Sequence, residues 1–183
     1  MLFRSVDVLH GFDGGPFTDQ TGTQVISAFH FDQKATQVLS LVETSLQLLE
    51  QARERRAISS SSAGDLWQLE IIISDGICQD HERLRTVLRR AEEQRVMIVF
   101  IILDSLHSRN VGSQAGAAGK NENSILSMNQ VAYKMVDWRM DLKVERYLDT
   151  FPFEYYVVLR NVEALPDVLS GTLKQFFERI AEA

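Results

Sequence analysis

The sequence predicts an α/β fold in which a mostly parallel sheet is covered by helices on both faces. Three observations support this prediction. Short apolar runs of strand length alternate with longer segments whose apolar residues recur every three or four positions. Val96–Leu103 is continuously apolar and Leu69–Ile73 is rich in β-branched residues, as is usual for strands that are buried on both faces. The two predicted strands Leu66–Ser74 and Val96–Leu103 are each followed directly by an aspartate, which is a common way for a buried strand to end in a turn.

Composition limits the class of protein. The chain has 183 residues, of which 45% are hydrophobic and 24% charged, and this is the profile of a soluble globular domain. Its net charge of −6 argues against direct binding to nucleic acid or to a membrane surface, because both need a clustered positive field. Arg4 and Asp7 interrupt the first apolar run, so we expect no signal peptide. The single cysteine, Cys78, is typical of a reducing compartment.

The first third of the chain predicts one strand and one long helix. Leu2–Leu9 alternates enough for a strand, whereas Thr18–Phe31 gives mixed signals. Between Gln33 and Arg56, apolar residues recur at helical spacing, which predicts an amphipathic helix with one buried stripe. Asp32 lies where the N-cap of this helix is expected.

The middle of the chain predicts two buried strands separated by a helix. A serine-rich segment at 58–64 is typical of a surface linker. Leu66–Ser74 contains a short β-branched core and is expected to be a strand. Asp80–Arg95 has apolar residues on one helical face, and Val96–Leu103 is an eight-residue apolar run that predicts a second strand.

The last third predicts a loop, a further strand and a closing helix. Ser105–Asn123 is rich in small polar residues, which indicates a flexible loop. Ile125–Tyr147 is ambiguous, with a ribbon as one interpretation. Tyr155–Arg160 is expected to be a strand, and Pro166 lies near the first turn of the final helix. The apolar side of that helix is predicted to consist of Leu165, Val168, Leu169, Leu173, Phe176, Phe177 and Ile180.

Three polar side chains are expected at the carboxyl ends of the strands, where open parallel sheets bind ligands. Asp75 and Asp104 each follow a strand directly, and Thr36 lies in the first turn of the long helix. Each has an ordinary alternative role, since Asp-Gly often forms a turn and an aspartate often ends a strand. Near this edge we expect His81 to be solvated and Cys78 to be packed rather than reactive.

Sequence motifs for enzyme chemistry are missing from the chain. It contains no glycine-rich phosphate-binding motif, no nucleophile elbow and no pair of histidines with zinc-binding spacing. We therefore do not expect the chain to catalyse a reaction. A metal-dependent hydrolase or a receiver-like α/β domain that uses Asp75 and Asp104 remains an alternative interpretation.

Three blocks of the sequence resemble the C-terminal domain of the midasin family, dynein-like AAA ATPases of ribosome assembly. The blocks are residues 65–85, 93–104 and 147–160, the last followed by Leu165-Pro166 and by the helix with Phe176-Phe177. The resemblance covers essentially the whole chain. It implies a von Willebrand A-type, Rossmann-like fold with a metal-ion-dependent adhesion site. In such a site a D-x-S-x-S motif, a threonine and an aspartate bind a divalent metal, and a partner's carboxylate takes the open position.

The resemblance implies roles for residues of two loops. It implies that Thr36 and Asp75 bind the metal, and that the residues next to them contact the partner. These neighbouring residues are Asp32, Gln33, Gly76, Cys78 and Gln79. The implied ion is Mg²⁺, or Mn²⁺ or Ca²⁺, all of which prefer oxygen ligands. D-x-S-x-S does not occur in the chain. Residues 1–183 are thus expected to form a partial domain without the central strand, which binds metal only when the D-x-S-x-S segment is present.

The function implied by the resemblance is the capture of a partner protein. The partners would be ubiquitin-like domains of WD40-repeat assembly factors on the pre-60S particle. The AAA ring of the same polypeptide would then pull the captured factor off, in the nucleolus and nucleoplasm, and the 105–123 loop could contact the ring or the particle. A third interpretation is a von Willebrand A scaffold that binds partners without a metal.

Overall fold

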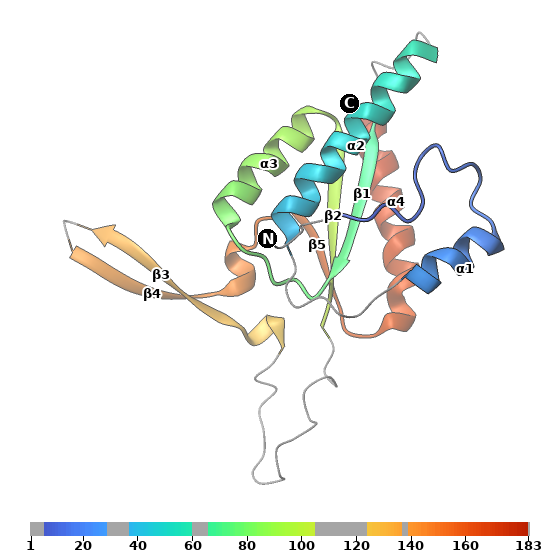
Figure 1. The fold of residues 1–183 in the computed structure, drawn as a ribbon. Coiled ribbons are helices and arrows are strands. Elements are labelled where there is room, and N and C mark those ends of the chain that lie inside the picture. The colour runs from blue at the N-terminus through green and yellow to red at the C-terminus, as the bar shows by residue number, and fades with distance from the viewer. Residues whose placement is uncertain (1–5, 29–36, 60–65, 105–123, 137–138, 183) are drawn as a thin grey trace, which may run out of the picture. The chain divides into compact units, whose positions relative to one another are not determined.

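The computed structural model describes residues 6–28, 37–59, 66–104, 124–136 and 139–182 (Figure 1). The chain forms two compact units, Met1–Leu66 and Trp67–Ala183. The predicted flexible loop at 105–123 lies outside the described residues. No helix among the described residues is long and apolar enough to cross a membrane.

The described residues of the first unit form two helices, α1 (Asp19–Ala28) and α2 (Val38–Ser59). Thr18 and Thr21 exchange hydrogen bonds between hydroxyl oxygens and backbone N–H groups at the start of α1, and this capping explains a helix in a segment that gave mixed signals. The predicted stripe of α2 is confirmed, because its apolar residues at steps of three and four are buried. These residues are Val38, Val42, Leu46 and Leu49.

Two predictions for the first unit need correction. Val6–Leu9, the described part of the predicted first strand, is not a strand, and none of the described strands pairs with it. A short alternating segment without a partner cannot complete its backbone hydrogen bonds as a strand. The helix α2 begins at Val38 rather than at Gln33, and Gln37 is not helical. The predicted N-cap, Asp32, lies outside the described residues.

The second unit is built on a parallel three-stranded sheet with the order β1-β2-β5. The strands are β1 (Gln68–Ser74), β2 (Val96–Leu103) and β5 (Tyr155–Leu159), close to the predicted bounds. The central strand β2 is buried along seven of its eight residues. Within the described residues, no further strand pairs with β1. The arrangement confirms the α/β prediction and is consistent with a Rossmann-like von Willebrand A fold.

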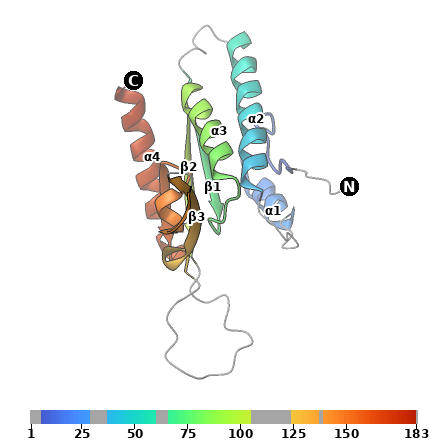
Figure 2. The ribbon, with the colours of Figure 1, turned by 90° about the vertical axis from the view of Figure 1, so that its left-hand side faces the viewer.

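Two helices of this unit, α3 (His81–Glu93) and α4 (Leu165–Glu182), lie on opposite faces of the sheet (Figure 2). Phe176 of α4 packs with Met97 and Val99, which point to one face of β2. Phe100 points to the other face, because successive side chains of a strand alternate. There it contacts the rings of Phe151 and Phe153, with centroids 5.4 and 4.7 Å away. Alternating side chains of β2 therefore contribute to the apolar core on both faces of the sheet.

The predicted apolar side of α4 is only partly buried. Phe176 is 8% exposed, whereas Leu173 is 44% and Phe177 is 63% exposed. Adjacent residues of a helix point about 100° apart, so Phe176 and Phe177 cannot both face the sheet. The expectation of one buried side that includes both phenylalanines was wrong.

The ambiguous segment after residue 124 forms an antiparallel ribbon of β3 (Asn129–Val136) and β4 (Arg139–Arg146). Figure 1 shows the ribbon extending away from the three-stranded sheet. Short 3₁₀ helices, η2 (Ile125–Ser127) and η3 (Tyr147–Thr150), lie at its base. The backbone N–H of Tyr147 donates to the carbonyl of Met128 at 2.9 Å, which closes the base of the ribbon.

Candidate functional site

The loop that carries Asp75 leaves the carboxyl end of β1 as a tight turn. The Asp75 side chain is exposed, and its Oδ1 accepts hydrogen bonds from the backbone N–H of Ile77 at 3.1 Å and from the Ser74 hydroxyl at 3.3 Å. Among the described residues, the second oxygen, Oδ2, receives no hydrogen bond. One face of the carboxylate therefore holds the turn, and the other is available for a ligand at the carboxyl edge of the sheet.

Gly76 fixes the path of this loop against the next strand. Its φ angle is +82°, in the left-handed region of backbone conformation, which residues other than glycine adopt only at an energetic cost. A Cβ atom at this position would lie 2.6 Å from Ile125 Cδ1 and 2.8 Å from Ile102 Cγ2. The loop thus lies tightly against the end of β2 and the start of η2, and only a residue without a side chain fits.

Asp104, at the carboxyl end of β2, is buried and holds the neighbouring chain segment through hydrogen bonds. Its Oδ2 accepts from the Ser124 hydroxyl at 2.5 Å, and its Oδ1 accepts from the Ile125 backbone N–H at 3.2 Å. Arg160, just after β5, brings its Nε to 3.8 Å from Oδ2. These contacts hold η2 in place beside Gly76. Both carboxylate oxygens of Asp104 are engaged inside the protein, so this side chain stabilises the edge and is poorly placed to act on a ligand.

A second group of contacts joins the loop after Asp75 to η3. The Tyr147 hydroxyl oxygen lies 2.7 Å from the backbone nitrogen of Cys78 and 3.0 Å from the carbonyl oxygen of Gly76. Nε2 of His81 lies 3.3 Å from the same hydroxyl. His81 was expected to be solvated, but it is only partly exposed and packs beside Tyr147, with ring centroids 5.3 Å apart.

Burial controls the titration of these side chains. Burial, as the main cause, raises the pKa of the Cys78 thiol to about 12, and the negative charge of Asp75 adds to the increase, while the contact with Tyr147 opposes it. Burial also raises the pKa of Tyr147 to about 12 and lowers the pKa of His81. At neutral pH, Cys78 is therefore a packed thiol and not a nucleophile, as its sequence context predicted.

The structure divides the predicted site residues into three groups. Asp75 and Gln79 are exposed at the carboxyl edge, where a partner can reach them. Gly76 and Cys78 are buried behind the exposed residues of this loop, and their assignment as partner-binding residues stays a prediction. The third group, Asp32, Gln33 and Thr36, lies outside the described residues, so its placement stays a prediction.

The metal predicted for this edge can be compared with the donors that the structure provides. Asp75 supplies an exposed carboxylate oxygen, which suits a hard cation such as Mg²⁺. In the described part of the chain, no group of three His, Cys, Asp or Glu side chains could hold a metal ion. Mg²⁺ takes six oxygen ligands, several of them waters. The described residues therefore fit a metal only as contributors of one ligand to a larger shell.

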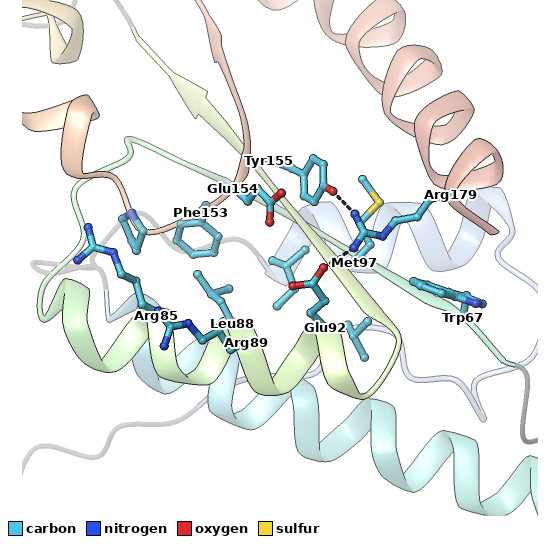
Figure 3. Close-up of a pocket in the computed structure, with 13 residues that line it drawn as sticks. Trp67, Arg85, Leu88, Arg89, Glu92, Met97, Phe153, Glu154, Tyr155 and Arg179 are labelled. Atoms are coloured by element: carbon cyan, nitrogen blue, oxygen red, sulfur yellow. Dashed lines mark hydrogen bonds and ion pairs between the residues drawn. The ribbon is translucent and has the colours of Figure 1, made fainter. Parts of the chain in front are cut away.

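A cavity of about 250 Å³ lies at the other end of the sheet, near the starts of β2 and β5 (Figure 3). Met97 and Phe153 contribute to its apolar lining, and Figure 3 shows Arg179 reaching toward both Glu92 and the Tyr155 hydroxyl. This volume is below the roughly 300–1,000 Å³ of typical ligand pockets. The charge of Arg179 is matched within the protein, so the cavity is a weaker candidate than the carboxyl edge.

Tyr147 and Ser124 are the parts of this edge that sequence reasoning missed. Tyr147 lies 69 residues from Cys78, its hydrogen-bond partner, and Ser124 lies 20 residues from Asp104. The one signal in the sequence was the ambiguous segment itself. A segment that returns to the sheet before the next strand must place its ends beside the strands it connects.

The chain is similar to two proteins named midasin. The chain is 34% identical over 178 residues to a Dictyostelium discoideum protein named midasin, and the aligned part is 96% of this chain and 3% of that protein. It is 25% identical over 172 residues to the midasin of Giardia intestinalis, with 91% of this chain and 3% of that protein aligned. No protein-family model matches the chain. The chain thus spans about 3% of the length of these relatives.

Proposed function

Since this chain belongs to the midasin family, we propose that it acts in ribosome assembly as part of a metal-dependent site that grips a partner's carboxylate. The observation that carries the proposal is the position of Asp75. Its carboxylate is exposed at the carboxyl edge of a parallel sheet, on a loop whose backbone is fixed by Gly76 and Tyr147. Parallel α/β sheets commonly bind ligands at this edge.

In this proposal the metal is Mg²⁺, held by Asp75, by Thr36 and by a D-x-S-x-S segment that is not in this sequence. When bound, the ion would supply a positive centre that attracts an external carboxylate. This chain's own residues hold the Asp75 carboxylate at the edge and present the exposed side chains of Ile77 and Gln79 beside it.

The partner in this proposal is a ubiquitin-like domain of a WD40-repeat assembly factor on the pre-60S particle, within the nucleolus and nucleoplasm. The AAA ring of the longer protein would supply the force that removes the captured factor. The chain itself is proposed to have no catalytic activity. The engagement of both Asp104 oxygens by Ser124 and Ile125 argues against a hydrolase that uses Asp75 and Asp104 together.

Replacing Asp75 by alanine is expected to weaken metal-dependent capture strongly. Groups that only orient a metal ligand contribute about 10–100-fold to affinity, so loss of a direct ligand should weaken capture by about 100-fold or more. The measurement is the dissociation constant between the full-length protein and a ubiquitin-like domain of a WD40-repeat assembly factor, in Mg²⁺ and in EDTA. EDTA should weaken the wild type to the level of D75A.

The matched control is Glu93→Ala, which removes an exposed carboxylate at the end of α3. It should leave the affinity unchanged. Wild-type capture that resists both EDTA and D75A would contradict the proposal and favour a scaffold that works without metal. A phosphoesterase activity that disappears in D75A would favour the hydrolase alternative instead.

A further inference from the structure

Tyr147 connects two structural features that lie far apart in the sequence. It is the first residue of η3, directly after the ribbon strand β4, and it is 6% exposed. Its backbone N–H closes the ribbon base by donating to Met128, while its hydroxyl reaches the loop between Asp75 and α3. The base of the ribbon is therefore joined to the proposed ligand loop by one side chain.

The contacts of the hydroxyl are matched to the donors and acceptors of this loop. A phenol has one proton to donate and lone pairs to accept with. The proton serves the Gly76 carbonyl at 3.0 Å, with the Cys78 carbonyl further away at 3.3 Å. A lone pair accepts from the Cys78 N–H at 2.7 Å. The hydroxyl thus completes two backbone groups on either side of Ile77 and fixes the turn between them.

A phenylalanine would fill the same space without making these bonds. Gly76 and Cys78 are both buried, so water has poor access to the backbone groups that the hydroxyl serves. A buried N–H or carbonyl that loses its partner carries a real energetic penalty. The loop would relieve this penalty by moving toward solvent, and Asp75 is the residue next to the part that would move.

We propose that Tyr147 is a positioning residue for the Asp75 carboxylate. The backbone before Asp75 is fixed by the pairing of Ser74 with Ile102, and the backbone after it is fixed by the Gly76 wedge and the Tyr147 hydroxyl. Loss of the hydroxyl keeps the Asp75 carboxylate itself but loosens the backbone on the C-terminal side of this residue. This inference rests on the proposed function, because it assigns to Asp75 a ligand that must be placed accurately.

Metal selectivity separates positioning from simple stabilisation. Mg²⁺ demands nearly ideal octahedral geometry at 2.0–2.1 Å, whereas Ca²⁺ accepts six to eight ligands in flexible arrangements. A loosened carboxylate should therefore harm Mg²⁺-supported binding more than Ca²⁺-supported binding. A variant that merely lowers the folded fraction would weaken binding with both ions by the same factor.

The experiment compares Tyr147→Phe with the wild type in the full-length protein. The dissociation constant for a ubiquitin-like domain of a WD40-repeat assembly factor is measured with Mg²⁺ and with Ca²⁺ as the only divalent ion. Y147F is expected to weaken Mg²⁺-supported binding about tenfold and Ca²⁺-supported binding less than about threefold. Tyr155→Phe is the matched control, because it removes a half-buried tyrosine hydroxyl that contacts Arg179 near the cavity at the amino ends of the strands. It should change neither constant.

Three results would overturn the inference. An unchanged Mg²⁺ affinity would show that the hydroxyl does not support Asp75, and equal losses with both ions would assign Tyr147 a structural role only. Wild-type binding that needs no metal would contradict the proposed function and remove the basis for a positioning role. The last result is distinguished from the first two by the wild type alone, before any Tyr147 variant is measured.

Discussion

Gly76→Ala is expected to lower the free energy of unfolding by about 2–4 kcal/mol, because it combines a left-handed backbone angle with a close approach. The φ angle is +82°, and the new methyl group would lie 2.6 Å from Ile125 Cδ1 and 2.8 Å from Ile102 Cγ2. Urea unfolding of the chain measures the change. Trp67 fluorescence, in a Trp138→Phe background, reports on the unit that contains the sheet, since Trp67 packs against its buried core.

Gly171→Ala is the control for this experiment. Gly171 lies within α4, and nothing approaches within 4 Å of a Cβ atom built there. Alanine should stabilise the helix by about 0.5–1 kcal/mol. The two glycine substitutions therefore have opposite predicted signs. A cost below about 1 kcal/mol for Gly76→Ala would mean that the Asp75 loop is not held against β2 as described.

Asp104→Ala is the second substitution with a large expected effect, a loss of about 2–4 kcal/mol in the free energy of unfolding. It removes the acceptor for two buried donors, the Ser124 hydroxyl and the Ile125 N–H, and each unsatisfied buried group costs about 1–3 kcal/mol. The interaction with Arg160 adds little, because that side chain is largely exposed and its nitrogen is 3.8 Å away. The same unfolding measurement applies.

Two variants place limits on this prediction. Asp104→Asn keeps one oxygen acceptor and should lose less than the alanine variant. Asp75→Ala removes an exposed carboxylate that supports only its own turn, and should cost less than about 1 kcal/mol. Equal losses in the free energy of unfolding for D104A and D75A would contradict the assignment of a structural role to Asp104 and a ligand-binding role to Asp75.

The strands of the sheet and most of the helices could be predicted from the sequence, because apolar runs and helical periodicity are local patterns. The apolar run 96–103 matched β2 residue for residue, and the helical period found α2, α3 and α4. The failures came where tertiary context decides. Val6–Leu9 alternates like a strand but is not paired in the described structure, and Phe177 has the right spacing but points away from the sheet.

The candidate site could be predicted only in part. That Asp75 and Asp104 end neighbouring strands follows from the parallel topology, but their different roles do not. The role of Asp104 depends on Ser124, and the fixed path of the Asp75 loop depends on Tyr147. Ser124 and Tyr147 lie far along the sequence from the residues that they contact, and no local sequence pattern predicts either contact. Burial of Gly76 and Cys78 has the same origin.

A double-mutant cycle tests the central claim most directly, because the claim is that one partner carboxylate and Asp75 act through the same ion. Each acidic residue of the partner's ubiquitin-like domain is replaced by its amide, and the affinity is measured in Mg²⁺ against the wild-type full-length protein and against D75A. We predict one acidic residue whose replacement costs as much as D75A, with no further loss when both changes are combined. If the loss of binding free energy for every acidic residue of the partner adds fully to the loss for D75A, no partner carboxylate acts through the same ion as Asp75. That result would contradict a carboxylate grip at Asp75.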